Sequence, residues 1–196
     1  MKITDLWFFL ATLAAFITIA AYPGEVWTSC PKSPGTARLV MVVPEDFERF
    51  VYVSSFKGEE TRHMLGEQAM DELRAQLSPF FSSMVIEHVD NEATAKEMII
   101  SRAYDRPDTR SNDVFAIPKF RNANFWVKGQ YYGFDIDLVV EVYPYDTSKV
   151  TQIRGHGESR TGFYADSSPG KSAGMALSKA VEAVADGVCQ AGNTLF

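Results

Sequence analysis

Histidine and cysteine are scarce in this chain, with three and two residues among 196. The histidines are scattered, and no two of them have the spacing with which one helix or strand builds a metal site. A serine nucleophile elbow is also absent, because Ser159 in "GHGES" stands outside the Gly-x-Ser-x-Gly frame. We therefore expect no enzymatic activity, no metal and no other cofactor.

A complete phosphate-binding loop is missing as well. The stretch "PGKSAG", residues 169–174, resembles the end of such a loop, but the first glycine of the motif is replaced by Ala165. Pro169 would also stiffen a loop that must wrap phosphate with its amides. Ser168 followed by Pro169 is instead a common helix start, so we predict a plain helix N-terminus here.

Basic residues are fewer than acidic ones. The chain has 19 Lys and Arg against 25 Asp and Glu, a net charge of −6. Without Lys2, Asp5 and Glu25 the counts are 18 and 23, so the remainder carries −5. Such a domain has no general attraction for nucleic acid, which we do not expect as a partner. Repeats and low-complexity tracts are lacking too, and the roughly 166 residues after position 30 suit one domain.

The amino terminus does contain a long run without charge, the 17 residues from Leu6 to Tyr22. As a helix it would span roughly 25 Å, the short end of a bilayer crossing. Aromatic residues stand near both ends, as at membrane interfaces, and Pro23 ends the run. We expect residues 1–24 to form a retained anchor that leaves the domain on the periplasmic or extracytoplasmic side. The expected anchor residues, which include a small-residue stripe suited to helix packing, are Trp7, Ala11, Ala14, Ala15, Thr18 and Tyr22.

Two other roles of this segment stay open. Ala20 and Ala21 are small residues suited to signal-peptide cleavage. Lipidation would use Cys30, although the bulky Trp27 matches the leading position of a lipoprotein signal poorly.

The two cysteines, Cys30 and Cys189, stand near the two ends of the domain. In an oxidising compartment they could form a disulfide, worth about 3–5 kcal/mol in the loop-entropy model. Two unpaired thiols are the alternative, because the sequence does not show that the ends meet.

The clearest secondary-structure pattern is "FDIDLVVEVY", residues 134–143. Its apolar residues share one face of a strand, and Asp135, Asp137 and Glu141 share the other, which we expect to be solvated. With tight connections at Gly133 and Pro144–Ser148, this strand and its two neighbours would form an antiparallel meander.

Helices are predicted at 65–80, after the cap residue Asn91, and at 170–188, and further strands at 37–43 and 84–89. We predict an α+β fold, a two-layer sandwich with a mainly antiparallel sheet and helices on one face. The expected divisions are an anchor at 1–24, a linker at 25–37, the domain at 38–190 and a tail at 191–196.

Aromatic residues are abundant on the central strands. Such clusters often mark partner surfaces, and ordinary core packing is the alternative. The predicted partner-contact residues are Phe125, Trp126, Tyr131 and Tyr132. A rival hypothesis, an exported enzyme or ligand-binding protein, would use the acidic strand face together with Gly155–Glu158. In that strand Gly155 and Gly157 alternate, which indicates either a bulge or a close approach of another backbone.

The order of these elements resembles the small envelope domains related to the TolB amino-terminal domain and to PelC-like outer-membrane lipoproteins. The resemblance covers roughly residues 37–188. It rests on the strand 38–43, the helix with Gly66, Ala69, Leu73 and Leu77, the alternating strand, and the Gly155/Gly157 strand before "MALSKAVEAV". The chain departs from those lipoproteins in lacking a clear lipobox.

This resemblance implies a non-catalytic structural or accessory subunit of a larger membrane or cell-envelope complex, and it carries over no site residues. The partners expected on this hypothesis are other subunits of that complex and the lipid bilayer, the latter through residues 6–22. Self-association into a homo-oligomer stays open.

Overall fold

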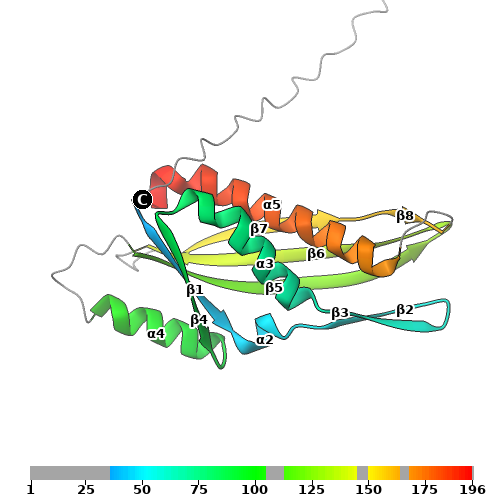
Figure 1. Cartoon of the computed structure of the whole chain (residues 1–196), viewed down its shortest axis with the longest axis horizontal. Helices are drawn as coiled ribbons and strands as arrows, with labels where there is room; N and C mark the ends of the chain where they lie inside the picture. Colours follow the sequence, from blue (N-terminus) through cyan, green and yellow to red (C-terminus); the bar gives the residue numbers. More distant parts are fainter. Residues whose placement is uncertain (1–35, 105–112, 145–149, 164–167, 196) are drawn as a thin grey trace, which may run out of the picture.

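The computed structural model describes residues 36–104, 113–144, 150–163 and 168–195. They form an α+β fold on a six-stranded sheet with the order β4-β1-β5-β6-β7, and β8 also pairs with β6 (Figure 1). The strands of this sheet are β1 (Arg38–Pro44), β4 (Ser83–Val89), β5 (Asp113–Lys128), β6 (Tyr131–Tyr143), β7 (Thr151–Glu158) and β8 (Thr161–Gly162).

The sheet is mixed and not mainly antiparallel as predicted. β1 pairs in parallel with both β4 and β5, whereas β5, β6 and β7 form the predicted antiparallel meander. The parallel half arises because helices connect β1 to β4 and β4 to β5, and a crossover connection returns the chain in the same direction. In the sequence, the continuous apolar run of β1 indicates this parallel half. A strand that is buried on both faces does not need alternating polar and apolar residues.

Helices cover both faces of the sheet, unequally. α3 (Leu65–Leu77) and α5 (Pro169–Leu195) pack with β1, β6 and β7 around the larger core. α4 (Glu92–Tyr104) packs on the opposite face of β1 and β5 around a smaller core (Figure 1). The prediction of helices on one face is therefore confirmed for α3 and α5 and wrong for α4. The reason lies in β1, where Val40 and Val42 point into the smaller core and Met41 into the larger.

α5 lies very close to β7 because β7 has glycine where the two backbones meet. A Cβ atom on Gly157 would stand 1.8 Å from the Ala176 carbonyl oxygen, and one on Gly155 would stand 1.9 Å from that of Ala180. Of the two alternatives that these alternating glycines indicate, a bulge and a close backbone approach, the structure has the close approach. As a result the face of the meander toward α5 is completely filled.

One short helix and a separate hairpin connect β1 to α3, and a short 3₁₀ helix follows α3. The turn Lys57-Gly58 has positive φ at both residues, 54° and 84°, which matches a tight two-residue hairpin turn. The stretch "FERFVYVSSF", residues 47–56, predicts an extended piece before this turn, and the structure forms a strand over its second half. The remaining elements are α2 (Glu45–Glu48), β2 (Tyr52–Phe56), β3 (Glu59–His63) and the 3₁₀ helix η1 (Ser78–Phe80).

Both predicted helix caps are present. The Asn91 side chain accepts a hydrogen bond from the Thr94 amide at 3.0 Å, and the Ser168 hydroxyl accepts one from the Lys171 amide at 3.3 Å. α5 continues to Leu195, so the expected tail at 191–196 is helical over its described part.

Within the described ranges no helix is both long and apolar enough to cross a membrane. The predicted anchor helix and its six named residues lie outside those ranges, as does Cys30. Cys189 lies half-buried in α5. The anchor and the Cys30–Cys189 disulfide therefore stay predictions.

Candidate functional site

The meander has one face turned away from α3 and α5, and polar residues from three strands line up across it. The register places Asn122, Asp137 and His156 in one row and Asn124, Asp135 and Glu158 in the next. Both asparagines, His156 and Glu158 are exposed, and the two aspartates are half-buried. This open face bears the acidic strand side chains predicted from the alternation of β6.

The four aromatic residues predicted as partner contacts do not share one surface. Tyr132 is only 2 % exposed, with its ring 5.0 Å from that of Phe56, and Phe125 packs against the larger core, 5.1 Å from Phe134. Tyr131 is 42 % exposed and lines the open face with the half-buried Trp126. Phe125 and Tyr132 therefore follow the alternative of ordinary core packing, whereas Trp126 and Tyr131 stay predicted partner contacts, because successive side chains in a strand point to opposite faces.

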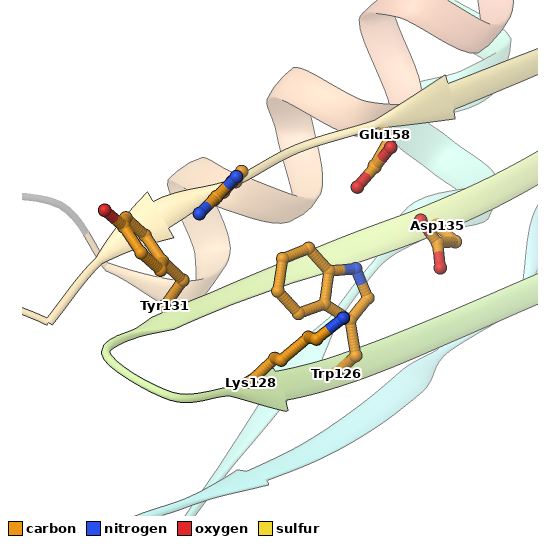
Figure 2. A pocket seen from close by; sticks show the side chains of 6 residues that line it. Trp126, Lys128, Tyr131, Asp135 and Glu158 are labelled. Atoms are coloured by element: carbon orange, nitrogen blue, oxygen red, sulfur yellow. The ribbon is translucent and has the colours of Figure 1, made fainter.

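Trp126 and Tyr131 line a hollow of about 360 Å³ on the open face, called the Trp126 hollow below. Figure 2 shows the indole in the middle of the group, with Asp135 and Glu158 on one side and Tyr131 on the other. Six of the described residues line the hollow. Trp126 and Lys128 belong to β5, and Tyr131 and Asp135 belong to β6. Glu158 ends β7, and Arg160 follows in the connection to β8.

The indole of Trp126 lies against a glycine of the neighbouring strand. Gly133 is the cross-strand partner of Trp126, and a Cβ atom there would lie 2.6 Å from Cζ2 of the indole. The prediction of a strand connection at Gly133 is wrong. The turn lies at Gly129-Gln130, with φ +61° at Gly129, and Gly133 is inside β6. The absent side chain lets the indole lie close against the backbone of β6.

The charged groups of the hollow stand in two sets. Asp135 and Glu158 are direct cross-strand partners, an arrangement that costs energy for like charges. Among the residues that the structure describes, neither carboxylate has a cationic group within ion-pair distance. The Arg160 guanidinium instead lies over the ring of Tyr131, 3.9 Å from its centroid. One end of the hollow thus has two carboxylates without an ion pair in the described structure, and the other end has a tyrosine ring that already holds a cation.

His156 does not join this group. Its Nδ1 lies 2.8 Å from Oδ1 of Asp137, one row further along the sheet. His156 therefore does not converge with Glu158 and Asp135, an arrangement that would favour the rival hypothesis of an exported enzyme or ligand-binding protein. In the described part of the chain, no cluster of three or more His, Cys, Asp or Glu side chains is placed to hold a metal ion.

Glu141 is expected from the alternation on a solvated face, but it is only 4 % exposed, which corrects that prediction. Its carboxylate accepts hydrogen bonds from Lys119 Nζ at 2.5 Å, the Tyr143 hydroxyl at 3.0 Å and Gln152 Nε2 at 3.0 Å. Burial by itself would raise the pKa of Glu141, but these donors outweigh it and hold the pKa below its ordinary value. All of its partners are structural, so we assign Glu141 a stabilising role.

Lys119 also lines a smaller hollow of about 190 Å³ beside Phe47, Phe50 and Phe120. Its ammonium group is engaged by Glu141 and lies 3.5 Å from Glu92. The cation of this hollow is therefore already paired with carboxylates, and we assign no ligand to the hollow.

A serine–histidine pair that no sequence motif predicts lies in the β2-β3 hairpin. Ser54 Oγ and His63 Nε2 are 2.8 Å apart. The residues are 2 % and 5 % exposed, and the imidazole packs edge-on against Phe134. Burial lowers the pKa of His63, so the ring is held neutral. Because a substrate cannot reach the enclosed hydroxyl, the pair joins the two strands and is not a catalytic dyad.

No protein-family model matches this chain, and no curated protein is significantly similar to it. Among solved structures, it is similar to the hypothetical protein CT253 from Chlamydia trachomatis, with a TM-score of 0.45 and 9 % sequence identity. That match covers 82 % of this chain and 98 % of the other. At this level a likeness assigns neither a family nor a function, and the resemblance to TolB- and PelC-like domains stays a prediction.

Proposed function

We propose that the protein is a non-catalytic accessory subunit of a larger membrane or cell-envelope complex and that it docks through the Trp126 hollow. The observation that supports this most is the contrast between the two faces of the meander. The face toward α5 is filled to backbone contact at Gly155 and Gly157. On the open face, an indole and a phenol ring border a hollow beside exposed polar residues.

Trp126 has the properties of an interface anchor. Tryptophan, tyrosine and arginine are enriched among the residues that dominate binding energy, and rigid rings lose little entropy on binding. The indole lies close against Gly133 in the unbound domain, so in this proposal it is already in position when a partner arrives. A preformed anchor of this kind favours recognition of another protein over chemical turnover.

In this proposal residues 1–24 hold the domain at a membrane, on its extracytoplasmic side, as the apolar run from Leu6 to Tyr22 indicates. The anchor would add contacts to neighbouring transmembrane helices through its small-residue stripe. Anchor and hollow together would fix both the location and the orientation of the domain on its complex.

One observation favours a second candidate, a binding protein for a small polar molecule. The hollow brings acceptors from Asp135 and Glu158 and donors from Lys128 and Arg160 to the rim of one indole. Its volume of about 360 Å³ is large enough for a small ligand. Such a ligand would make the protein a sensor or carrier and would not require a complex.

Native purification decides between the two. The full-length protein would be isolated from the membranes of the cells that make it, and co-purifying subunits would be identified by mass spectrometry. Trp126→Ala should reduce the recovered partner at least tenfold, because a hot-spot residue typically contributes about 2 kcal/mol or more. Full recovery of the partner with this variant would contradict docking through the hollow.

Two control variants accompany this experiment. Met175→Ala removes a 40 % exposed apolar side chain from α5, on the other side of the molecule, and should retain the partner. Tyr132→Ala empties a core position and should lower the unfolding free energy by about 3 kcal/mol or more. If Trp126→Ala destabilises the domain as much as Tyr132→Ala does, Trp126 has a core role and the proposal loses its support.

A further inference from the structure

Neither carboxylate at the acidic end of the Trp126 hollow forms an ion pair within the described residues, and the nearby Lys179 ammonium donates to the backbone carbonyl of Glu158 at 2.8 Å. The two carboxylates, Asp135 and Glu158, face each other across β6 and β7. The neighbouring acid on the same face, Asp137, does have a partner, His156 at 2.8 Å. Directly opposed like charges are destabilising, so a cation arriving between Asp135 and Glu158 would gain two attractions and relieve a repulsion.

The indole beside these carboxylates sets the shape of that cation. Figure 2 shows Trp126 lying next to Asp135 and Glu158. A guanidinium group is planar, so it can stack on an indole face while its edge donates hydrogen bonds to carboxylates. The ammonium group of lysine is a compact point charge without a flat face, so it matches this combination of ring and carboxylates less closely.

The hollow already contains one contact of this kind. The Arg160 guanidinium lies 3.9 Å from the ring centroid of Tyr131, and Tyr131 lies on the side of Trp126 away from the two carboxylates (Figure 2). Tyr131 thus already binds an arginine of this chain at one end of the hollow. At the other end Trp126 has a larger ring and lies beside two carboxylates.

We propose that the Trp126 hollow binds an arginine side chain of a partner protein, stacked on the Trp126 indole and paired with Asp135 and Glu158. This inference rests on the proposed docking function and names the chemistry that the docking face recognises. Charge complementarity supports it at the scale of the chain as well, because a chain of net charge −6 attracts a basic segment. Arg160 and Lys128, at the rim, can donate to backbone carbonyls of the same segment.

The test uses the full-length protein in detergent micelles, labelled with ¹⁵N, and follows the indole N–H signal of Trp126. A Trp126→Phe variant identifies that signal among those of the three tryptophans. The probes are the peptide acetyl-Gly-Arg-Gly-amide, its citrulline counterpart, which has the same shape without the charge, and its lysine counterpart. We expect the arginine peptide to shift the signal saturably, the lysine peptide to bind several-fold more weakly, and the citrulline peptide to have no effect.

Matched substitutions on the open face identify the carboxylates involved. Asp135→Asn and Glu158→Gln should each weaken arginine-peptide binding about fivefold, which corresponds to the upper range of an exposed ion pair. Asp137→Asn, two residues along the same face and paired with His156, should leave binding unchanged. Equal shifts with the arginine and citrulline peptides, or equal effects of Asp135→Asn and Asp137→Asn, would overturn the inference.

A neutral oligosaccharide, chitotetraose, is the competing probe. If it shifts the Trp126 signal and the arginine peptide does not, the hollow binds sugars and the arginine inference is wrong. The outcome is distinguishable from failure of the docking proposal, which depends on partner recovery with Trp126→Ala. If that variant loses the partner while the arginine peptide fails to bind, docking stands and only its chemistry is refuted.

Discussion

At the scale of single residues, the environment of His63 predicts a measurable pH dependence. Burial lowers the pKa of its imidazole in the folded chain, where it meets Ser54 and Phe134. The unfolded chain therefore binds a proton more readily, so the unfolding free energy should fall as the pH drops below the ordinary histidine value of about 6.5. Above that pH the contribution of His63 is constant. The decrease ends once the pH lies below the pKa of the folded state.

Urea unfolding of the wild-type protein and of His63→Gln at several pH values between about 5 and 8 measures this contribution. The variant should be less stable near neutral pH, because it loses packing against Phe134, and its stability should depend less on pH over the acidic part of the range. Parallel pH profiles for the two proteins would show that His63 does not titrate on unfolding.

Single residues also show the limit of prediction from sequence. Phe125 and Trp126 are adjacent in the chain and equally aromatic, yet one packs in the core and the other borders the hollow. The alternation of β6 is readable because its polar and apolar residues differ in kind. On β5 aromatic residues fall on both faces, so composition cannot separate core from surface. The sequence also predicts the β5-β6 connection at Gly133 instead of Gly129, which shifts the predicted pairing of the two strands.

At the scale of elements, the contact of α5 with β7 is the most demanding packing in the described structure. Gly157→Ala would place a methyl group 1.8 Å from the Ala176 carbonyl oxygen, so helix or strand must move. We expect this substitution to lower the unfolding free energy by about 2 kcal/mol, as is usual for overpacked cores.

Gly174→Ala, on α5 and away from the contact with β7, is the control. No atom lies within 4 Å of a Cβ added there, and alanine is favoured over glycine inside a helix by about 1 kcal/mol. This variant should be neutral or stabilising in chemical denaturation. If both alanine variants unfold at the same urea concentration, the close helix–strand contact does not exist in solution.

The elements themselves are largely predictable from the sequence, and their arrangement is less so. The helices α3, α4 and α5 and the strands β4 and β6 follow from periodicity and from caps such as Asn91. The parallel neighbours of β1 and the position of α4 depend on which strands pair, and the sequence contains no local signal for pairing between distant strands. The site depends on that same pairing, since it joins residues of β5 and β6 with Glu158 and Arg160.

At the scale of the whole molecule, the proposed function assigns different tasks to the two faces of the meander. One face stabilises the fold through α3 and α5, and the other, centred on the Trp126 hollow, would bind a partner. The anchor proposed for residues 1–24 would keep the domain near the membrane where that partner resides.

Site-specific photo-crosslinking in the cells that make the protein tests this division of tasks most directly. A photoreactive amino acid would replace either Asn124, exposed on the open face, or Met175, exposed on α5. Docking through the open face predicts a crosslink to another subunit from position 124 and none from position 175. Crosslinks from position 175 together with none from position 124 would contradict it.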